Sequence, residues 1–99
     1  MKRAISGHSI MVAAREQVYC NLDGEVVILN LKDGVYYGLN AVGARIWNLL
    51  QEPRTMHEVR DILAQEYEVE TDRCEHDLLA LLQELATEGL IEIKDERAG

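Results

Sequence analysis

The chain has 99 residues, of which 47% are hydrophobic and 28% are charged, and its formal net charge is −8. A chain of this length and composition folds as one domain around a single core, which excludes intrinsic disorder and a two-domain organisation. No apolar run approaches the roughly 20 residues of a membrane-spanning helix, and residues 7–9 interrupt the apolar segment that an export signal needs. We therefore expect a cytoplasmic protein without a membrane partner.

Residues 1–9 are polar or small, and we expect them to form a flexible N-terminus. Two Asp-Gly pairs follow, Asp23-Gly24 and Asp33-Gly34, each between apolar runs rich in β-branched or aromatic residues. Asp-Gly favours the type I′ turn of a tight hairpin, because both central residues of that turn need positive φ. The pattern predicts an antiparallel meander whose first and third strands lie on its edges: residues 18–22, 26–31 and 35–39.

The apolar period changes from 2 to 3.6 at Asn40, which is a good N-cap for a first helix that ends before Pro53. Thr55 and Glu58 then form the capping-box pattern at the start of a second helix. Each of the two helices carries one apolar stripe at helical spacing.

A third helix is predicted from a cap at Thr71 or Asp72 to about Glu88. Gly89 fits the left-handed position after a helix, which allows Leu90 to fold back on the last turn. Residues 91–93 suggest a short terminal strand, and residues 95–99 form a charged tail.

This order of elements predicts an α+β fold. The second and third helices, joined by a few residues, have the proportions of a helix-turn-helix. We therefore predict a winged helix-turn-helix-like domain over residues 10–94, with a three-stranded antiparallel meander, three helices and a possible short terminal strand.

The motifs do not indicate a metal site or a catalytic site. Cys74 and His76 are two positions apart, so on a helix they point about 200° apart and cannot hold one ion together. We interpret Cys74 as a small hydrophobic core residue and His76 as exposed. The chain has no C-x-x-C, H-x-x-x-H or G-x-S-x-G sequence and no glycine-rich phosphate loop, so we expect no metal, no cofactor and no enzymatic activity.

The charge distribution also argues against nucleic-acid binding. Residues 1–54 carry six basic and five acidic side chains, whereas residues 55–88 carry two basic and ten acidic ones. A DNA-reading helix needs basic side chains for the phosphates, and the predicted third helix offers Arg73 against five acids. We therefore expect no nucleic-acid partner.

Two features favour peptide binding instead. The third strand, Val35–Leu39, is an edge strand without charge or proline, the features that usually protect an edge from pairing. The third helix is apolar over roughly 160°, wider than the ~100° that a core requires. Alternatives remain open: either edge could pair with residues 10–14 or 91–93, and the extra leucines could fill the core or face a second copy.

The stretch Leu29–Trp47, which reads LNLKDGVYYGLNAVGARIW, resembles the PqqD-like family, as do Leu78–Leu85 and Gly89-Leu90. The similarity covers about residues 18–93. It implies a small winged-helix-like domain called a RiPP recognition element, where RiPPs are ribosomally made peptides that are later modified. Such domains hold the leader segment of a precursor peptide and present its core segment to a modifying enzyme. In the family, the leader adds as a strand to the third strand and rests against the third helix.

Carried over by position, the resemblance implies two groups of peptide-binding residues. These are Val35, Tyr36, Tyr37 and Gly38 for backbone pairing, and Cys74, Asp77, Leu78 and Leu81 for the groove. They belong to the same edge strand and broad helical stripe that the residues alone indicate.

The YYGLN sequence followed by Ile46-Trp47 looks most like the stand-alone members of lasso-peptide pathways. The implied partner is a leader peptidase of the cysteine-protease type, working with an ATP-dependent cyclase. The alternatives are a pyrroloquinoline quinone-type peptide chaperone for a radical SAM enzyme, and a dimeric winged-helix regulatory domain that pairs its own edge strand.

Overall fold

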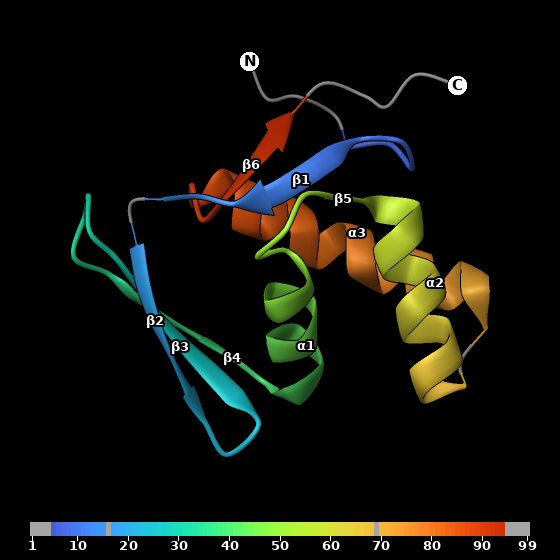
Figure 1. The fold of residues 1–99 in the computed structure, drawn as a ribbon, viewed down its shortest axis with the longest axis horizontal. Coiled ribbons are helices and arrows are strands. Elements are labelled where there is room, and N and C mark those ends of the chain that lie inside the picture. The colour runs from blue at the N-terminus through green and yellow to red at the C-terminus, as the bar shows by residue number, and fades with distance from the viewer. Residues whose placement is uncertain (1–4, 16, 69, 95–99) are drawn as a thin grey trace.

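The computed structural model describes residues 5–15, 17–68 and 70–94, and it has the predicted α+β fold (Figure 1). The first element, β1, begins at residue 10, and the last element, β6, ends at residue 94. The charged tail expected at residues 95–99 lies outside the described residues. The elements in chain order are β1 (Ile10–Ala13), β2 (Gln17–Leu22), β3 (Glu25–Asn30), β4 (Tyr36–Leu39), α1 (Ala41–Leu49), β5 (Arg54–Thr55), α2 (Met56–Tyr67), α3 (Thr71–Thr87) and β6 (Ile91–Lys94). No helix in the described part of the chain is long and apolar enough to cross a bilayer.

The predicted meander is confirmed as the antiparallel sheet β2–β3–β4. The terminal strand β6 is also confirmed, but it pairs with β1 in a second sheet of order β5–β1–β6. Residues 10–13 and 91–94 therefore pair with each other and not with the meander. Among the described residues, no strand pairs with the outer edge of β2 or of β4.

The first hairpin has the predicted turn, since Asp23 and Gly24 have φ values of 50° and 83°. The prediction of a second type I′ turn is wrong, because Gly34 has a positive φ and Asp33 does not. Asn30 causes this difference: its backbone carbonyl accepts from the Gly34 N–H at 2.8 Å, and its side-chain oxygen accepts from the Lys32 N–H at 2.9 Å. These bonds close a longer loop with one left-handed glycine.

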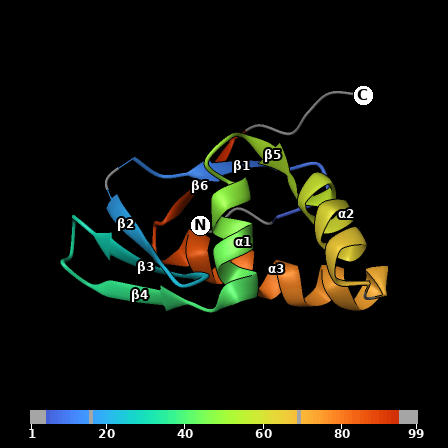
Figure 2. The same ribbon diagram turned by 60° about the horizontal axis from the view of Figure 1, so that its bottom comes forward.

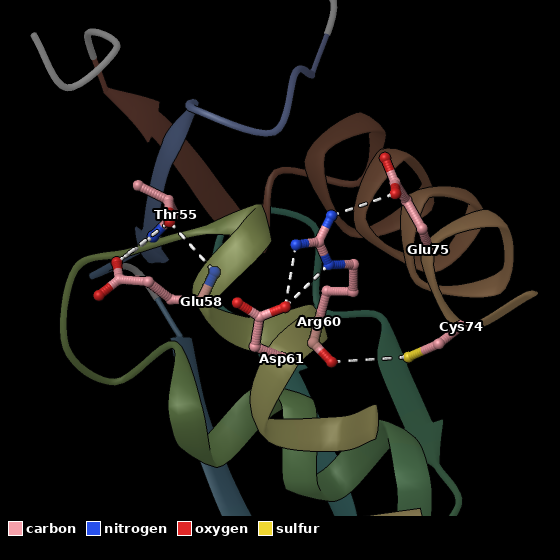
Figure 3. Close-up of polar contacts among 6 residues, drawn as sticks. All are labelled: Thr55, Glu58, Arg60, Asp61, Cys74 and Glu75. Carbon is pink, nitrogen blue, oxygen red and sulfur yellow. Dashed lines mark hydrogen bonds and ion pairs between the residues drawn. The ribbon is translucent and has the colours of Figure 1, made fainter. Parts of the chain in front are cut away.

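The caps of the first two helices are as predicted. Asn40 Oδ1 accepts from the Gly43 N–H at 2.9 Å, and Thr55 and Glu58 form the reciprocal capping box drawn in Figure 3. The expected cap of α3 at Thr71 or Asp72 is wrong, because the helix begins one residue earlier, after Glu70, which makes no side-chain cap bond.

The core lies between the meander, the three helices and the second sheet. Trp47 of α1 is fully buried, and its ring meets the Tyr19 ring of β2 edge to face, with centroids 5.6 Å apart. The flexible segment expected at residues 1–9 is described only from residue 5 onward, and there the chain packs on the domain. Ile5 and Ser9 are buried, and the Gly7 carbonyl accepts from the backbone N–H of His57 at 3.1 Å.

Candidate functional site

A pocket of about 550 Å³ lies where the end of β4, the start of α1 and the middle of α3 meet. Figure 2 shows β4 running into the start of α1, and α3 contributes residues to the same pocket. The lining residues come from β4 and all three helices: Gly38, Leu39, Asn40, Val42, Gly43, Ile46, Leu63, Tyr67, Cys74, Asp77, Leu78, Leu81 and Glu84. Most of them are apolar, and Asp77 and Glu84 place two carboxylates on the α3 side.

The backbone of β4 offers hydrogen-bonding groups next to this pocket. The Asn30 N–H donates to the Val35 carbonyl at 3.0 Å, and bonding in an antiparallel ladder alternates along the strand. Tyr37 and Leu39 therefore use their backbone groups toward β3, whereas Tyr36 and Gly38 direct theirs to the outer edge. Within the described ranges no strand occupies that edge.

The structure brings most of the expected site residues together. Gly38 and the four expected α3 residues, namely Cys74, Asp77, Leu78 and Leu81, all line the pocket. Tyr36 and Tyr37 belong to β4 but do not line it. Val35 precedes the strand, where its N–H donates to Asp33 Oδ1 at 2.9 Å and its carbonyl accepts from Asn30, so its backbone is engaged in the turn.

Sequence reasoning missed the contribution of the first two helices to the pocket. Val42, Gly43 and Ile46 of α1 and Leu63 and Tyr67 of α2 complete the lining. Gly43 carried a signal: a Cβ there would lie 3.2 Å from the Leu39 Cβ, so glycine lets α1 start close to the end of β4.

The interpretation of Cys74 as a core residue is confirmed. Its side chain is buried, and its Sγ donates to the Arg60 carbonyl at 3.9 Å, as drawn in Figure 3. Burial raises the pKa of the Cys74 thiol, so it stays protonated at neutral pH and is a poor nucleophile. His76 is exposed, and no three His, Cys, Asp or Glu side chains of residues 5–15, 17–68 and 70–94 form a metal-binding group.

Glu88, the C-cap of α3, connects this helix to the meander. The Tyr37 hydroxyl donates to Glu88 Oε2 at 2.7 Å, and the Asn30 side-chain amide donates to the Glu88 backbone carbonyl at 3.1 Å. The Tyr37 bond links the edge strand β4 to the end of α3, and the Asn30 bond links the end of β3 to the same residue.

The sequence profile of the family described as "Coenzyme PQQ synthesis protein D (PqqD)" matches residues 25–91, which include every expected site residue. The chain belongs to the PqqD family. The curated proteins contain no match to it.

Three solved structures resemble this PqqD-family chain. "TbiB1 in Complex with the TbiA(beta) Leader Peptide" has 39% identity and a TM-score of 0.79, over 86% of this chain and 99% of that one. "Lasso peptide synthetase B1 complexed with the leader peptide" has 29% identity and a TM-score of 0.74, over 83% and 96% of the two chains. The PqqD part of PqqCD from Methylobacterium extorquens, described as a RiPP recognition element, has 22% identity and a TM-score of 0.75, over 90% and 95%, and supports the fold.

The bond between Tyr37 and Glu88 predicts an unusual tyrosine titration in this PqqD-family protein. The hydrogen bond to the Glu88 carboxylate, followed by burial and charge repulsion, raises the pKa of Tyr37 from 10.0 to about 12. Its stabilising contribution is therefore complete below pH 10 and is lost as the pH rises toward 12. Glu88→Gln should lower the pKa of Tyr37, because the amide carries no negative charge.

Ultraviolet absorbance of ionised tyrosine measures this titration, and subtracting the curve of a Tyr37→Phe variant isolates Tyr37 from the other three tyrosines. Circular dichroism over the same pH range verifies that the fold persists. An unchanged Tyr37 titration in the Glu88→Gln variant would contradict the assigned cause.

Proposed function

We propose that this protein binds the leader segment of a ribosomally made precursor peptide and presents it to a modifying enzyme, without catalysing a reaction itself. The leader would pair as an extended strand with the β4 edge, through the outward backbone groups of Tyr36 and Gly38, with Val35 and Tyr37 beside them. Alternate leader side chains would enter the pocket against Cys74, Asp77, Leu78 and Leu81.

The observation that carries this proposal is the coincidence of an unpaired edge and a pocket at β4. The β2 edge is also unpaired among the described residues, but β2 contributes no residue to the pocket. A strand added at β4 therefore gains backbone hydrogen bonds together with burial of its side chains, whereas a strand at β2 would gain the backbone bonds without this pocket. The two similar structures with 39% and 29% identity are complexes with leader peptides, which supports the same choice.

The chemistry of the one cysteine in the pocket supports the non-catalytic part of the proposal. Cys74 is the one cysteine in the lining, and its thiol is buried and bonded to a backbone carbonyl, which makes it a poor nucleophile.

The two carboxylates of the pocket bear on the choice of leader. Asp77 and Glu84 favour a leader with a basic side chain near the residues that fill the pocket.

For the partner enzyme, we propose a leader peptidase of the cysteine-protease type in a lasso-peptide pathway, working beside an ATP-dependent cyclase. One of the similar structures is a lasso peptide synthetase B1, which supports this partner over a radical SAM enzyme.

Titration of the fluorescently labelled leader from the adjacent precursor gene tests the proposed function. We expect saturable binding with a 1:1 endpoint, followed by fluorescence anisotropy, and no saturable binding of a scrambled leader of the same composition. The proposal would be overturned if the protein bound duplex DNA tightly and had the same affinity for the leader as for the scrambled leader. Light scattering during the titration distinguishes a 1:1 complex from a dimer that pairs its own strands.

A further inference from the structure

Glu88, at the C-terminus of α3, joins the two sides of the proposed leader site by polar contacts. Its Oε2 accepts from the Tyr37 hydroxyl of β4 at 2.7 Å, and its backbone carbonyl accepts from Asn30 Nδ2 at 3.1 Å. None of these three residues lines the pocket. A role of Glu88 in leader binding would therefore act through the placement of β4.

Asn30 is a buried polar residue, and each of its hydrogen-bonding groups has a partner. Its side-chain oxygen accepts from the Lys32 N–H at 2.9 Å, and its backbone carbonyl accepts from the Gly34 N–H at 2.8 Å. Its backbone N–H donates to the Val35 carbonyl at 3.0 Å. Since its side-chain amide also donates to Glu88, Asn30 ties the loop that leads into β4 to the end of α3.

The contacts of Glu88 lie next to the residues that line the pocket. Gly38 follows Tyr37 on β4 and belongs to the lining. Glu84 precedes Glu88 by one helical turn and also belongs to it, and its carbonyl accepts from the Glu88 N–H at 3.0 Å. A change in the spacing of Tyr37 and Glu88 would therefore alter the width of the pocket at this end.

β4 and α3 otherwise pack mainly on different neighbours. β4 pairs with β3 and packs on α1, whereas α3 packs mainly on α2 and β6. After Leu39 the chain continues into α1, and the lack of a side chain at Gly43 lets this helix start close to the strand. Nearer the start of β4, the bond from Tyr37 reaches α3 directly. The two sides of the site are thus joined at both ends.

The bond between Tyr37 and Glu88 is exposed to solvent in the free protein, so its contribution to folding is modest. A leader strand on β4 would shield it from water, and a hydrogen bond to a carboxylate becomes stronger where the local dielectric is lower. A site that is already arranged as in the complex also loses less entropy on binding. The bond should therefore favour the leader-bound state more than it favours the folded state.

We propose that Glu88 is a positioning residue for leader binding, which holds β4 at the spacing from α3 that the incoming strand requires. This inference rests on the proposed function, because the leader is the strand that β4 would receive. Glu88 would raise leader affinity through Tyr37, without contacting the leader itself.

Leader affinity across a double-mutant cycle tests this role. Tyr37→Phe removes the hydroxyl and keeps the ring and the backbone. Glu88→Ala removes the carboxylate and keeps the backbone carbonyl that accepts from Asn30. We expect each single variant to bind the labelled leader about fivefold more weakly than the parent, and the double variant to bind no more weakly than either single variant. Fluorescence anisotropy gives the affinities.

Further variants and a stability measurement distinguish positioning from a merely structural effect. Glu88→Gln keeps an acceptor for the Tyr37 hydroxyl, so its leader affinity should lie within about twofold of the parent. Tyr19→Phe deletes a hydroxyl on β2, at the other edge of the meander, and should leave leader affinity unchanged. Urea unfolding should show that Tyr37→Phe and Glu88→Ala change the equilibrium constant for unfolding by a smaller factor than they change leader affinity.

The outcomes separate this role from the proposed function. Failure of the parent protein to bind the leader would overturn the proposed function and this inference with it. Normal binding by the parent, with both single variants within about twofold of it, would overturn the positioning role alone. Additive losses in the double variant would mean that Tyr37 and Glu88 contact the leader independently, which also overturns it. Equal losses in the Glu88→Gln and Glu88→Ala variants would assign the effect to the charge of Glu88 and overturn it as well.

Discussion

Replacing Gly38 with proline is expected to weaken leader binding at least about tenfold, equivalent to ~1.4 kcal/mol, without disrupting the fold. Gly38 lies opposite Val27 in a pair that does not exchange hydrogen bonds, so its N–H points to the open edge. Proline removes that donor and places its ring where the incoming strand would lie. The φ of Gly38 is not among the positive values that exclude proline, and Tyr37 before it is in a strand, the conformation that a residue before proline prefers. Circular dichroism of the variant verifies that the fold persists.

Two matched variants complete this experiment. Gly38→Ala keeps the N–H, and a Cβ at this position meets no atom within 4 Å, so leader affinity should stay close to that of the parent. Asn21→Pro makes the same change on β2, where the alternation also directs the N–H to an open edge, and it should leave leader affinity unchanged. The measurement is anisotropy with the labelled leader. Equal affinities of the Gly38→Pro and Gly38→Ala variants would exclude pairing at this part of β4.

The sequence predicted the elements well where their signals are local. Asn40 caps α1, and Thr55 and Glu58 form the expected box. At the end of α3, Gly89 has a φ of 74° and the Leu90 N–H donates to the Leu85 carbonyl at 2.9 Å, as a Schellman ending requires. Each of these features depends on residues at most five positions apart, so the rest of the fold has little influence on them.

Features set by distant contacts could not be predicted in this way. β1 pairs with β6 from the other end of the chain, and nothing in the residues specified this partner over the edges of the meander. The second turn depends on Asn30, whose side chain also bonds to Glu88, 58 residues later. The pocket residues of α1 and α2 depend on how those helices pack, which a hydrophobic period does not specify.

The broad apolar stripe of α3 illustrates both cases. Its width correctly indicated more than a simple core contact, because α3 packs against α2 and β6 and also lines the pocket. The sequence could not separate the two roles: Leu78, Leu82 and Leu85 are buried, whereas Leu79 and Leu81 are half-buried.

Leu78→Ala is expected to reduce the free energy of unfolding by about 2–5 kcal/mol, a large part of the stability of a small domain. Leu78 is 2% exposed and belongs to the main core cluster, so its truncation removes buried surface and leaves a cavity. Its position on the pocket lining means that leader affinity should also fall, but part of that loss would come from the weakened fold. Leu78→Asp would place an unpaired charge in the core and is expected to prevent folding.

Leu81 separates the two effects, because it lines the same pocket and is only half-buried. Leu81→Ala should lower stability by about 1 kcal/mol and leader affinity several-fold. Leu79→Ala is the matched control, because Leu79 is also half-buried and packs on the core but does not line the pocket. The Leu79→Ala variant should therefore keep the leader affinity of the parent protein. Urea unfolding and leader titration on the same preparations give both quantities. Equal leader affinities for the Leu79→Ala and Leu81→Ala variants would show that the α3 side of the pocket does not contact the leader. An unaltered unfolding midpoint for the Leu78→Ala variant would contradict the place of Leu78 in the core.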